Sequence, residues 1–276
     1  MSIIKKVKLL LFFKSSIYNS IINNVVDKKI LANPESLWRG DKKNGVKILD
    51  GFINYQKETV YIGKKIWGKN HGSQLWRCYL NSYMWVRDIR AVGTNKARIF
   101  LRKKLTEWLD YSDYLDESVW STEVLSKRIF YLLTNLSFFF DTANEEFQIN
   151  FSENINKQCI LLFNRTKKQK NVLDDIFVIK AILLSTLCFR NLEKNYQLTV
   201  NLLKKIIEKK TLTDGMHYLR SPSEHFFFLC SLIDIRNFLG GQKKDIPSEL
   251  NQKIREMINV LKFFRIGDGH LAIFNK

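Results

Sequence analysis

Hydrophobic side chains recur every three to four residues from Gly72 towards the C-terminus, which is the spacing of amphipathic α-helices. In the first of these segments, Leu75, Tyr79 and Val86 share one helix face. We expect further helices over residues 95–109, 119–140, 151–163, 173–189, 196–209, 224–239 and 247–264. Short polar loops join them, so neighbouring helices should run antiparallel. The pattern predicts a mainly all-α fold of helical hairpins, arranged as a bundle, a superhelix or a curved toroid.

The pattern is different before Gly72. Hydrophobic and polar residues alternate over 46–52 and 58–62, which predicts a small β-hairpin within residues 46–62, with an irregular extended arm as the alternative. Residues 1–36 are expected to form an N-terminal helical arm, and residues 37–276 the main domain. The apolar run at 9–13 is too short for a signal peptide, and no run is long enough to span a membrane. We therefore expect a cytoplasmic protein, with a periplasmic or membrane-peripheral location as the alternative.

Composition narrows the class of protein. The chain has 276 residues, 45% of them hydrophobic, which is enough for one sizeable core, and its 3 prolines and 12 glycines are few for a β-sandwich or barrel. Four cysteines, Cys78, Cys159, Cys188 and Cys230, lie far apart without metal-ligand spacing. We expect reduced thiols, no bound metal and no nucleotide, because the sequence also contains no phosphate-binding glycine motif.

The net charge is +18, from 45 basic and 27 acidic residues. A charge of this sign favours polyanionic partners such as acidic polysaccharide, nucleic acid or an anionic membrane. The alternative is a lysine-rich composition without a specific partner, because the lysines are scattered in short runs. Nucleic acid is not the expected partner, since it would require a continuous basic stripe.

The densest polar chemistry lies in the stretch 212–228, LTDGMHYLRSPSEHFFF. Asp214-Gly215 predicts a turn, and the sequence from Ser221 to Glu224 predicts a capped helix start with proline at its first position. The loop 216–220 should therefore place His217, Tyr218 and Arg220 beside a helix N-terminus, which suits an anion. The alternative is a simple helix cap next to a loop histidine that bonds a backbone carbonyl.

A second candidate lies between Trp76 and Gly93, where Trp76 and Trp85 precede Arg87. Aromatic rings stack on the faces of sugar rings, and a guanidinium pairs with a carboxylate, so these side chains could hold an acidic sugar. The alternative is that the tryptophans belong to the core and that Arg87 pairs with Asp88 at the surface.

Several motifs resemble the heparinase II/III family of polysaccharide lyases. The segment DGMHYLRSPSEH is similar to the family's DGxHxxRSPxYH, with these positions in place: Asp214, Gly215, His217, Arg220, Ser221, Pro222 and His225. Glu224 stands where the family has its catalytic tyrosine. Residues 38–52 are similar to WxGDxxxGxxxLxGxF, residues 83–93 to FxWLRDLRAxG, and the C-terminal segment to MLRFFRHGDGxLALFN. The resemblance covers roughly residues 30–275.

This resemblance implies an incomplete (α/α) toroid that acts on acidic polysaccharide by β-elimination at a uronic acid, without a cofactor. It implies that His217, Arg220 and His225 hold or neutralise the sugar carboxylate, and that Glu224 takes the acid/base position, with Tyr218 as a substitute. Asn171 is the nearest counterpart of the family's catalytic asparagine. Arg87, Trp85 and Trp76 would bind substrate.

Family members continue into a β-sandwich domain, whereas this sequence stops at Lys276. The resemblance therefore implies that the β-sandwich partner is encoded separately, lost, or cut from a longer protein. An incomplete or degenerate lyase is one expectation. The alternative is a non-catalytic helical module that binds acidic glycan or another polyanion in cell-envelope metabolism.

Overall fold

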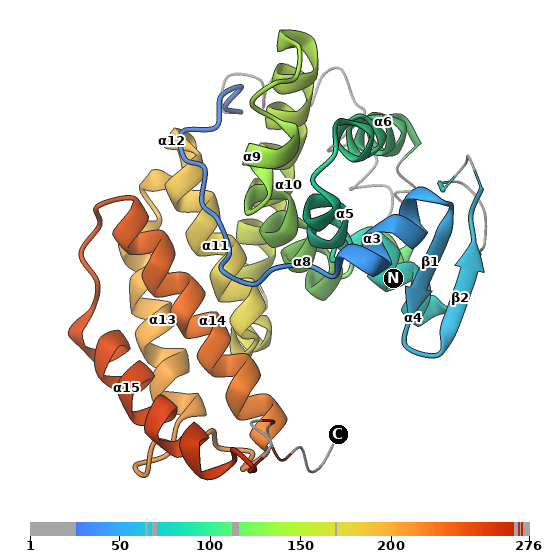
Figure 1. The fold of residues 1–276 in the computed structure, drawn as a ribbon. Helices are drawn as coiled ribbons and strands as arrows, with labels where there is room; N and C mark the ends of the chain where they lie inside the picture. The colour runs from blue at the N-terminus through green and yellow to red at the C-terminus, as the bar shows by residue number, and fades with distance from the viewer. Residues whose placement is uncertain are drawn as a thin grey trace.

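A computed structural model of the chain describes residues 26–63, 66–67, 71–111, 116–168, 170–267, 270 and 272. The protein is mainly α-helical, and its antiparallel helical hairpins form an incomplete toroid, as the sequence predicted (Figure 1). The helices are α3 Lys42–Leu49, α4 Gln74–Ser82, α5 Val86–Val92, α6 Asn95–Tyr111, α7 Glu117–Trp120, α8 Thr122–Leu133, α9 Leu136–Phe139, α10 Glu145–Lys168, η1 Lys170–Asp174, α11 Ile176–Cys188, α12 Arg190–Glu193, α13 Tyr196–Lys210, α14 Pro222–Gly241 and α15 Ser248–Phe263. No helix in these residues is long and apolar enough to cross a membrane.

The core is built around α11, in which every residue is buried. Its sequence, IFVIKAILLSTLC, is apolar on all sides, as expected for a helix that is surrounded by others. It packs against α8, α13 and α14 (Figure 1). The one lysine of this helix, Lys180, therefore lies inside the protein.

Polar caps divide some of the predicted helices. The helix expected over 119–140 is three helices, because the Ser121 side chain accepts a hydrogen bond from the Val124 N–H and begins α8 anew. The face that includes Leu75 and Val86 is split between α4 and α5 at Tyr83, which has a left-handed φ of 57° and a fully buried ring. The segment expected to begin at 173 starts as the 3₁₀ turn η1, and Asp175 then caps α11.

The hairpin exists, but its first strand was predicted in the wrong place. Strands β1 Phe52–Tyr55 and β2 Glu58–Tyr61 pair antiparallel, with Phe52 opposite Tyr61. Residues 46–49 belong to α3 because the Asp41 carboxylate caps that helix, accepting from the Lys43 and Asn44 N–H groups. The buried positions of α3, Gly45 and Ile48, are three residues apart, which is a helical spacing that the alternating pattern concealed.

Residues 26–41, called the strap here, contain no helix, so the predicted helical arm is wrong for residues 26–36; residues 1–25 lie outside the described chain. The strap runs across α11 and α14 towards α3 (Figure 1). Its Leu31 N–H donates to the Cys188 carbonyl at 2.9 Å, and its Ser36 hydroxyl donates to Asp234 at 3.1 Å. The strap thus joins elements that are far apart in sequence.

The strap ends against α5. The buried Asp88 carboxylate accepts from the Asp41 N–H at 2.8 Å and from the Asn44 side-chain amide at 2.7 Å. Gly40 lies so close to the peptide that follows Arg87 that a Cβ on it would be 2.2 Å from the Arg87 carbonyl oxygen. This contact therefore requires glycine.

Gly40→Ala should lower the free energy of unfolding by about 2–3 kcal/mol, because both neighbouring groups are backbone and cannot move aside cheaply. Gly241→Ala is the matched control, since no atom lies within 4 Å of its added Cβ, and its stability should be unchanged or slightly raised. Urea denaturation measures both. Equal stability of the two variants would contradict the tight contact between strap and α5.

Candidate functional site

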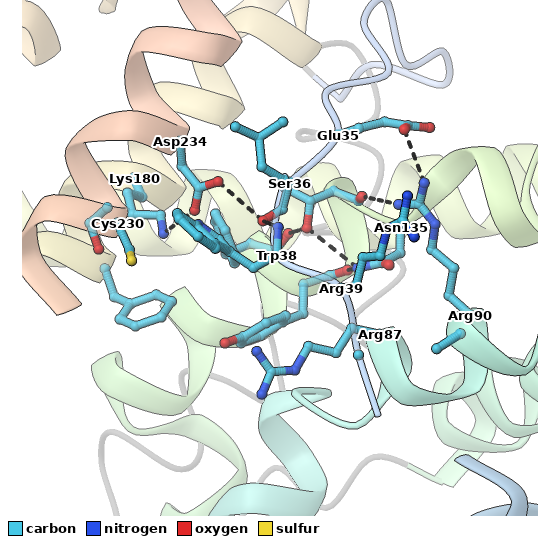
Figure 2. A pocket seen from close by; sticks show the side chains of 18 of the residues that line it. Glu35, Ser36, Trp38, Arg39, Arg87, Arg90, Asn135, Lys180, Cys230 and Asp234 are labelled. Atoms are coloured by element: carbon cyan, nitrogen blue, oxygen red, sulfur yellow. Dashed lines mark hydrogen bonds and ion pairs between the residues drawn. The ribbon is translucent and has the colours of Figure 1, made fainter. Parts of the chain in front are cut away.

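A cleft of about 820 Å³ lies between the strap and the helices α5, α8, α11 and α14 (Figure 2). The strap forms one wall and α14 contributes aromatic residues to another. The lining residues are Glu35, Ser36, Leu37, Trp38, Arg39, Gly40, Lys42, Arg87, Arg90, Ala91, Phe130, Tyr131, Thr134, Asn135, Phe177, Lys180, Phe226, Phe227, Cys230, Ser231 and Asp234. Among the described residues, no group of three His, Cys, Asp or Glu side chains could hold a metal ion.

Arg87 is one of the cations available to a ligand. Its neighbour Asp88 is already occupied by the Asp41 and Asn44 donors, and the Arg87 Nε lies 3.8 Å from the nearer Asp88 oxygen. The buried Nε–H has no hydrogen-bond partner in the described part of the chain. The Arg87 guanidinium carbon lies 6.0 Å from the centre of the Tyr131 ring, and Figure 2 shows the side chain extending into the cleft.

The acidic side chains of the cleft are already paired. Glu35 accepts from the Ser137 hydroxyl at 2.5 Å and from the Arg90 guanidinium at 2.9 Å, and these contacts lower the pKa of its carboxyl despite partial burial. Asp234 accepts from Lys180 at 2.8 Å. Arg39 and Lys42 form no ion pair with any described residue, so together with Arg87 they leave the cleft positively charged.

Lys180 is held in an aromatic box on the cleft wall. Its ammonium lies 3.9 Å from the centre of the Phe130 ring and 4.8 Å from that of Phe177. Burial lowers the pKa of Lys180, and the ion pair with Asp234 acts in the opposite direction. Because the other Asp234 oxygen accepts from Ser36, this pair also fixes the strap to α14.

Exposed rings surround the cleft. Trp38 on the strap and Phe226 on α14 stand edge to face with their centroids 6.5 Å apart. Phe227 packs on Phe177 at 5.3 Å, yet it remains 40% exposed. Ring faces next to guanidinium groups without a hydrogen-bonded acidic partner among the described residues, such as those of Arg39 and Arg87, are suited to a sugar that carries an acid.

The histidines of the 212–228 stretch lie outside this cleft and inside the protein. His225 is fully buried; its Nδ1 accepts from the His217 N–H at 3.2 Å, and its Nε2 donates to the Met257 carbonyl at 2.9 Å. Burial lowers the pKa of His225. The ring therefore links the loop, α14 and α15, and both nitrogens are occupied, which corrects the expectation that His225 contacts substrate.

His217 is 3% exposed, and its ring packs on Tyr218 and Phe228. Burial, reinforced by Lys210 and His225, lowers the pKa of His217 to about 4. Its Nδ1 has no partner among the described residues. The ring is uncharged at neutral pH, so it cannot neutralise a carboxylate by its charge, contrary to what the resemblance implied.

The remaining loop residues are exposed. Arg220 pairs with Asp214 at 3.2 Å beside a separate pocket of about 420 Å³, so it does not join Arg87. The Tyr218 hydroxyl accepts from Lys210 at 3.1 Å. Glu224 follows the Ser221 cap, whose hydroxyl accepts its N–H. It is exposed and does not line the cleft.

The predicted sugar-stacking tryptophans are core residues. Trp76 and Trp85 are fully buried, and their indole N–H groups donate to the Ile53 and Leu80 carbonyls. No ring face remains for a ligand, which corrects that prediction. Asn171 is exposed in η1 and does not line the cleft.

Sequence reasoning missed Tyr131, Lys180 and Asp234 as cleft residues. They lie within strongly hydrophobic helices, where their spacing gives no sign of a site. The strap could have been found, because Trp38 and Gly40 belong to the segment 38–52 that resembles a motif of the lyase family.

The helices form a toroid of the kind found in solved heparinase structures. Residues 74–276 match the family described as heparinase II/III N-terminus. The chain belongs to that family.

The chain is also similar to individual relatives and solved structures. FtsZ-localized protein C of Caulobacter vibrioides is 24% identical over 237 residues, which are 85% of this chain and 41% of that protein. The heparan sulfate lyase HepC of Pedobacter heparinus has a similar fold, with a TM-score of 0.65 and 19% identity over 85% of this chain and 40% of that one. Heparinase III has a TM-score of 0.67 and 14% identity over 96% of this chain and 46% of its own. The chain thus spans less than half the length of each.

The depressed pKa of His217 predicts a loss of stability in acid. The unfolded chain takes up a proton near the ordinary histidine pKa of 6.5, whereas the folded chain does so only near pH 4, so protonation favours unfolding between these values. His217 should account for roughly 2–3 kcal/mol of this loss. His217→Phe should reduce the pH dependence of the free energy of unfolding, measured with urea between pH 7 and 4, a range chosen to bracket the shift. An unchanged pH dependence in His217→Phe would contradict the assignment.

Proposed function

We propose that the cleft binds a glycan that contains uronic acid, and that the chain acts on it as the toroid part of a heparinase-type lyase. One observation carries this proposal: the Arg87 guanidinium is open to the cleft because Asp88 is bonded to the strap and α3. A bound carboxylate would supply the hydrogen-bonded anion that Arg87 lacks among the described residues.

The surroundings of Arg87 support the same ligand. Arg39 and Lys42 add positive charge, and Trp38 and Phe226 offer rings on which sugar faces can stack. An acidic glycan matches both properties at once, whereas a neutral glycan would leave the cations without a partner. Heparan sulfate, the glycan after which the structural relative HepC is named a lyase, is an acidic glycan of this class.

β-Elimination needs little more than this cleft and a proton-transfer group. A cation on the uronate carboxylate makes the C5 proton more acidic, because charge that develops in the transition state is stabilised. A base then removes that proton, and an acid protonates the departing O4. Arg87 is proposed for the first task. Glu224 and Tyr218, two exposed residues of the 212–228 stretch, do not line this cleft.

A second function is favoured by a different observation. His217 and His225 are buried and pack the loop against α14 and α15, so these two motif residues stabilise the fold. A relative, FtsZ-localized protein C, is named for where it is found and not for a reaction. The alternative is therefore a non-catalytic module that holds acidic glycan in the cell envelope.

Arg87→Ala should weaken the binding of hyaluronan or heparan sulfate oligosaccharides about ten- to a hundredfold, because a charge-assisted hydrogen bond contributes about 1.5–3 kcal/mol. Arg255→Ala removes the same charge from an exposed position on α15 and is the matched control. Isothermal titration calorimetry at fixed salt measures both. Equal weakening in the two variants would indicate only a general charge effect and would contradict a site at Arg87.

Turnover separates the two functions. A lyase produces an unsaturated uronate, whose double bond absorbs in the ultraviolet, from at least one of heparan sulfate, chondroitin, hyaluronan and alginate. Glycan binding that depends on Arg87 without such a product identifies the non-catalytic module. Neither binding nor product with any of these glycans would contradict both functions.

A further inference from the structure

Tyr131 on α8 occupies an unusual position. It is 7% exposed and lines the cleft, and its hydroxyl forms no hydrogen bond with any described residue. The ring is fixed by edge contacts with Phe130, at 5.1 Å between centroids, and by Phe177 at 6.2 Å. A buried phenol is normally hydrogen-bonded, so one that meets only the cleft has its polar atom free for a ligand.

Charges of both signs surround this phenol. Arg87 lies 6.0 Å from its ring, and Asp234, with its partner Lys180, acts on it from the opposite wall. Lys180 is in turn 3.9 Å from the Phe130 ring that packs on Tyr131. A carboxylate bound by Arg87 would therefore lie close to the phenol. The carbon next to that carboxylate carries the proton that β-elimination removes.

We propose that Tyr131 is the proton-transfer residue of the cleft, and that Arg87 and Tyr131 together perform the elimination on a bound uronate. This inference rests on the proposed lyase function. The Tyr131 phenolate takes the proton from C5, and the C5–H electron pair becomes the C4=C5 double bond. The C4–O4 bond breaks with its electrons on O4, and the phenol then gives its proton to O4. The phenolate is restored, and no other reactant is consumed.

Neither Glu224 nor Tyr218, the proton-transfer residues that the family resemblance implies, lies in the cleft beside Arg87. Glu224 is exposed and does not line the cleft, and Tyr218 is bonded to Lys210 outside it. Tyr131 instead lines the cleft together with Arg87, the cation that would bind the substrate.

The pH profile follows from the surroundings of the phenol. Burial raises the pKa of Tyr131, and Arg87 acts against that rise. The phenolate is therefore the minor form at neutral pH, and its fraction increases about tenfold per pH unit until the pKa is reached. The value of kcat/KM should rise with pH in the same way.

The experiment compares the full chain with three variants on the glycan that it cleaves fastest. Tyr131→Phe removes the hydroxyl and keeps the ring, so it should lose at least about a hundredfold in kcat and lose the alkaline rise, while glycan affinity stays within about twofold. Tyr83→Phe is the matched control, because the Tyr83 hydroxyl is buried in the core without a partner in the described residues. Its turnover should equal that of the original chain. Glu224→Gln should also remain active.

Three results would overturn the inference. If Tyr131→Phe keeps its turnover and pH profile, Tyr131 is not the proton-transfer residue, and the lyase function still stands. If Glu224→Gln alone is inactive, proton transfer belongs to the motif. If the original chain binds glycan through Arg87 but forms no product, the lyase function and this inference fail together. Thermal unfolding of each variant shows whether a loss of turnover is a loss of folding.

Discussion

The buried carboxylate of Asp88 is the interaction on which the cleft depends. Burying a carboxylate is costly, and burial raises the pKa of Asp88, while the Asn44 and Asp41 donors oppose that rise. Because those two donors come from the start of α3, the same bonds fix the strap against α5 and bring Gly40 onto the Arg87 backbone. They also occupy the Asp88 oxygens, so Arg87 keeps only a long ion pair with Asp88, at 3.8 Å, and its Nε–H has no hydrogen-bond partner among the described residues. The need to hydrogen-bond the buried Asp88 carboxylate thus positions the strap wall of the cleft and leaves the Arg87 guanidinium accessible to a ligand.

A second buried pair holds the other end of the strap. Lys180 and Asp234 lie on α11 and α14, and Ser36 reaches the same carboxylate from the strap. An ion pair inside a protein is not in itself stabilising, since desolvation offsets much of the attraction. Here the ion pair positions the strap against α14. It also neutralises the Asp234 carboxylate, which would otherwise repel an anionic ligand. The cleft is left with a net positive charge.

The helices were predictable because their hydrophobic period is a local property, and the caps at Ser121, Asp175 and Ser221 show why their boundaries were less so. The first hairpin strand was wrong because Val46 and Ile48 alternate along a segment that Asp41 caps as a helix. The strap could not be predicted as a wall, since its bonds join residues such as Ser36 and Asp234 across most of the chain. Trp76 and Trp85 looked like ligand residues because composition does not distinguish a buried ring from an exposed one. Tyr131 could not be recognised as a cleft residue, because it lies within a hydrophobic helix where a core tyrosine would show the same pattern.

Hydrogen–deuterium exchange with and without a saturating uronate oligosaccharide is the most direct test that the cleft holds the ligand, because it locates the ligand without any substitution. We predict slower exchange at residues 35–42, 84–90 and 226–234, which form the strap, α5 and α14 walls, and no change at residues 214–220. Protection confined to residues 214–220 and the end of α15, with the cleft walls unchanged, would contradict a glycan site in the cleft.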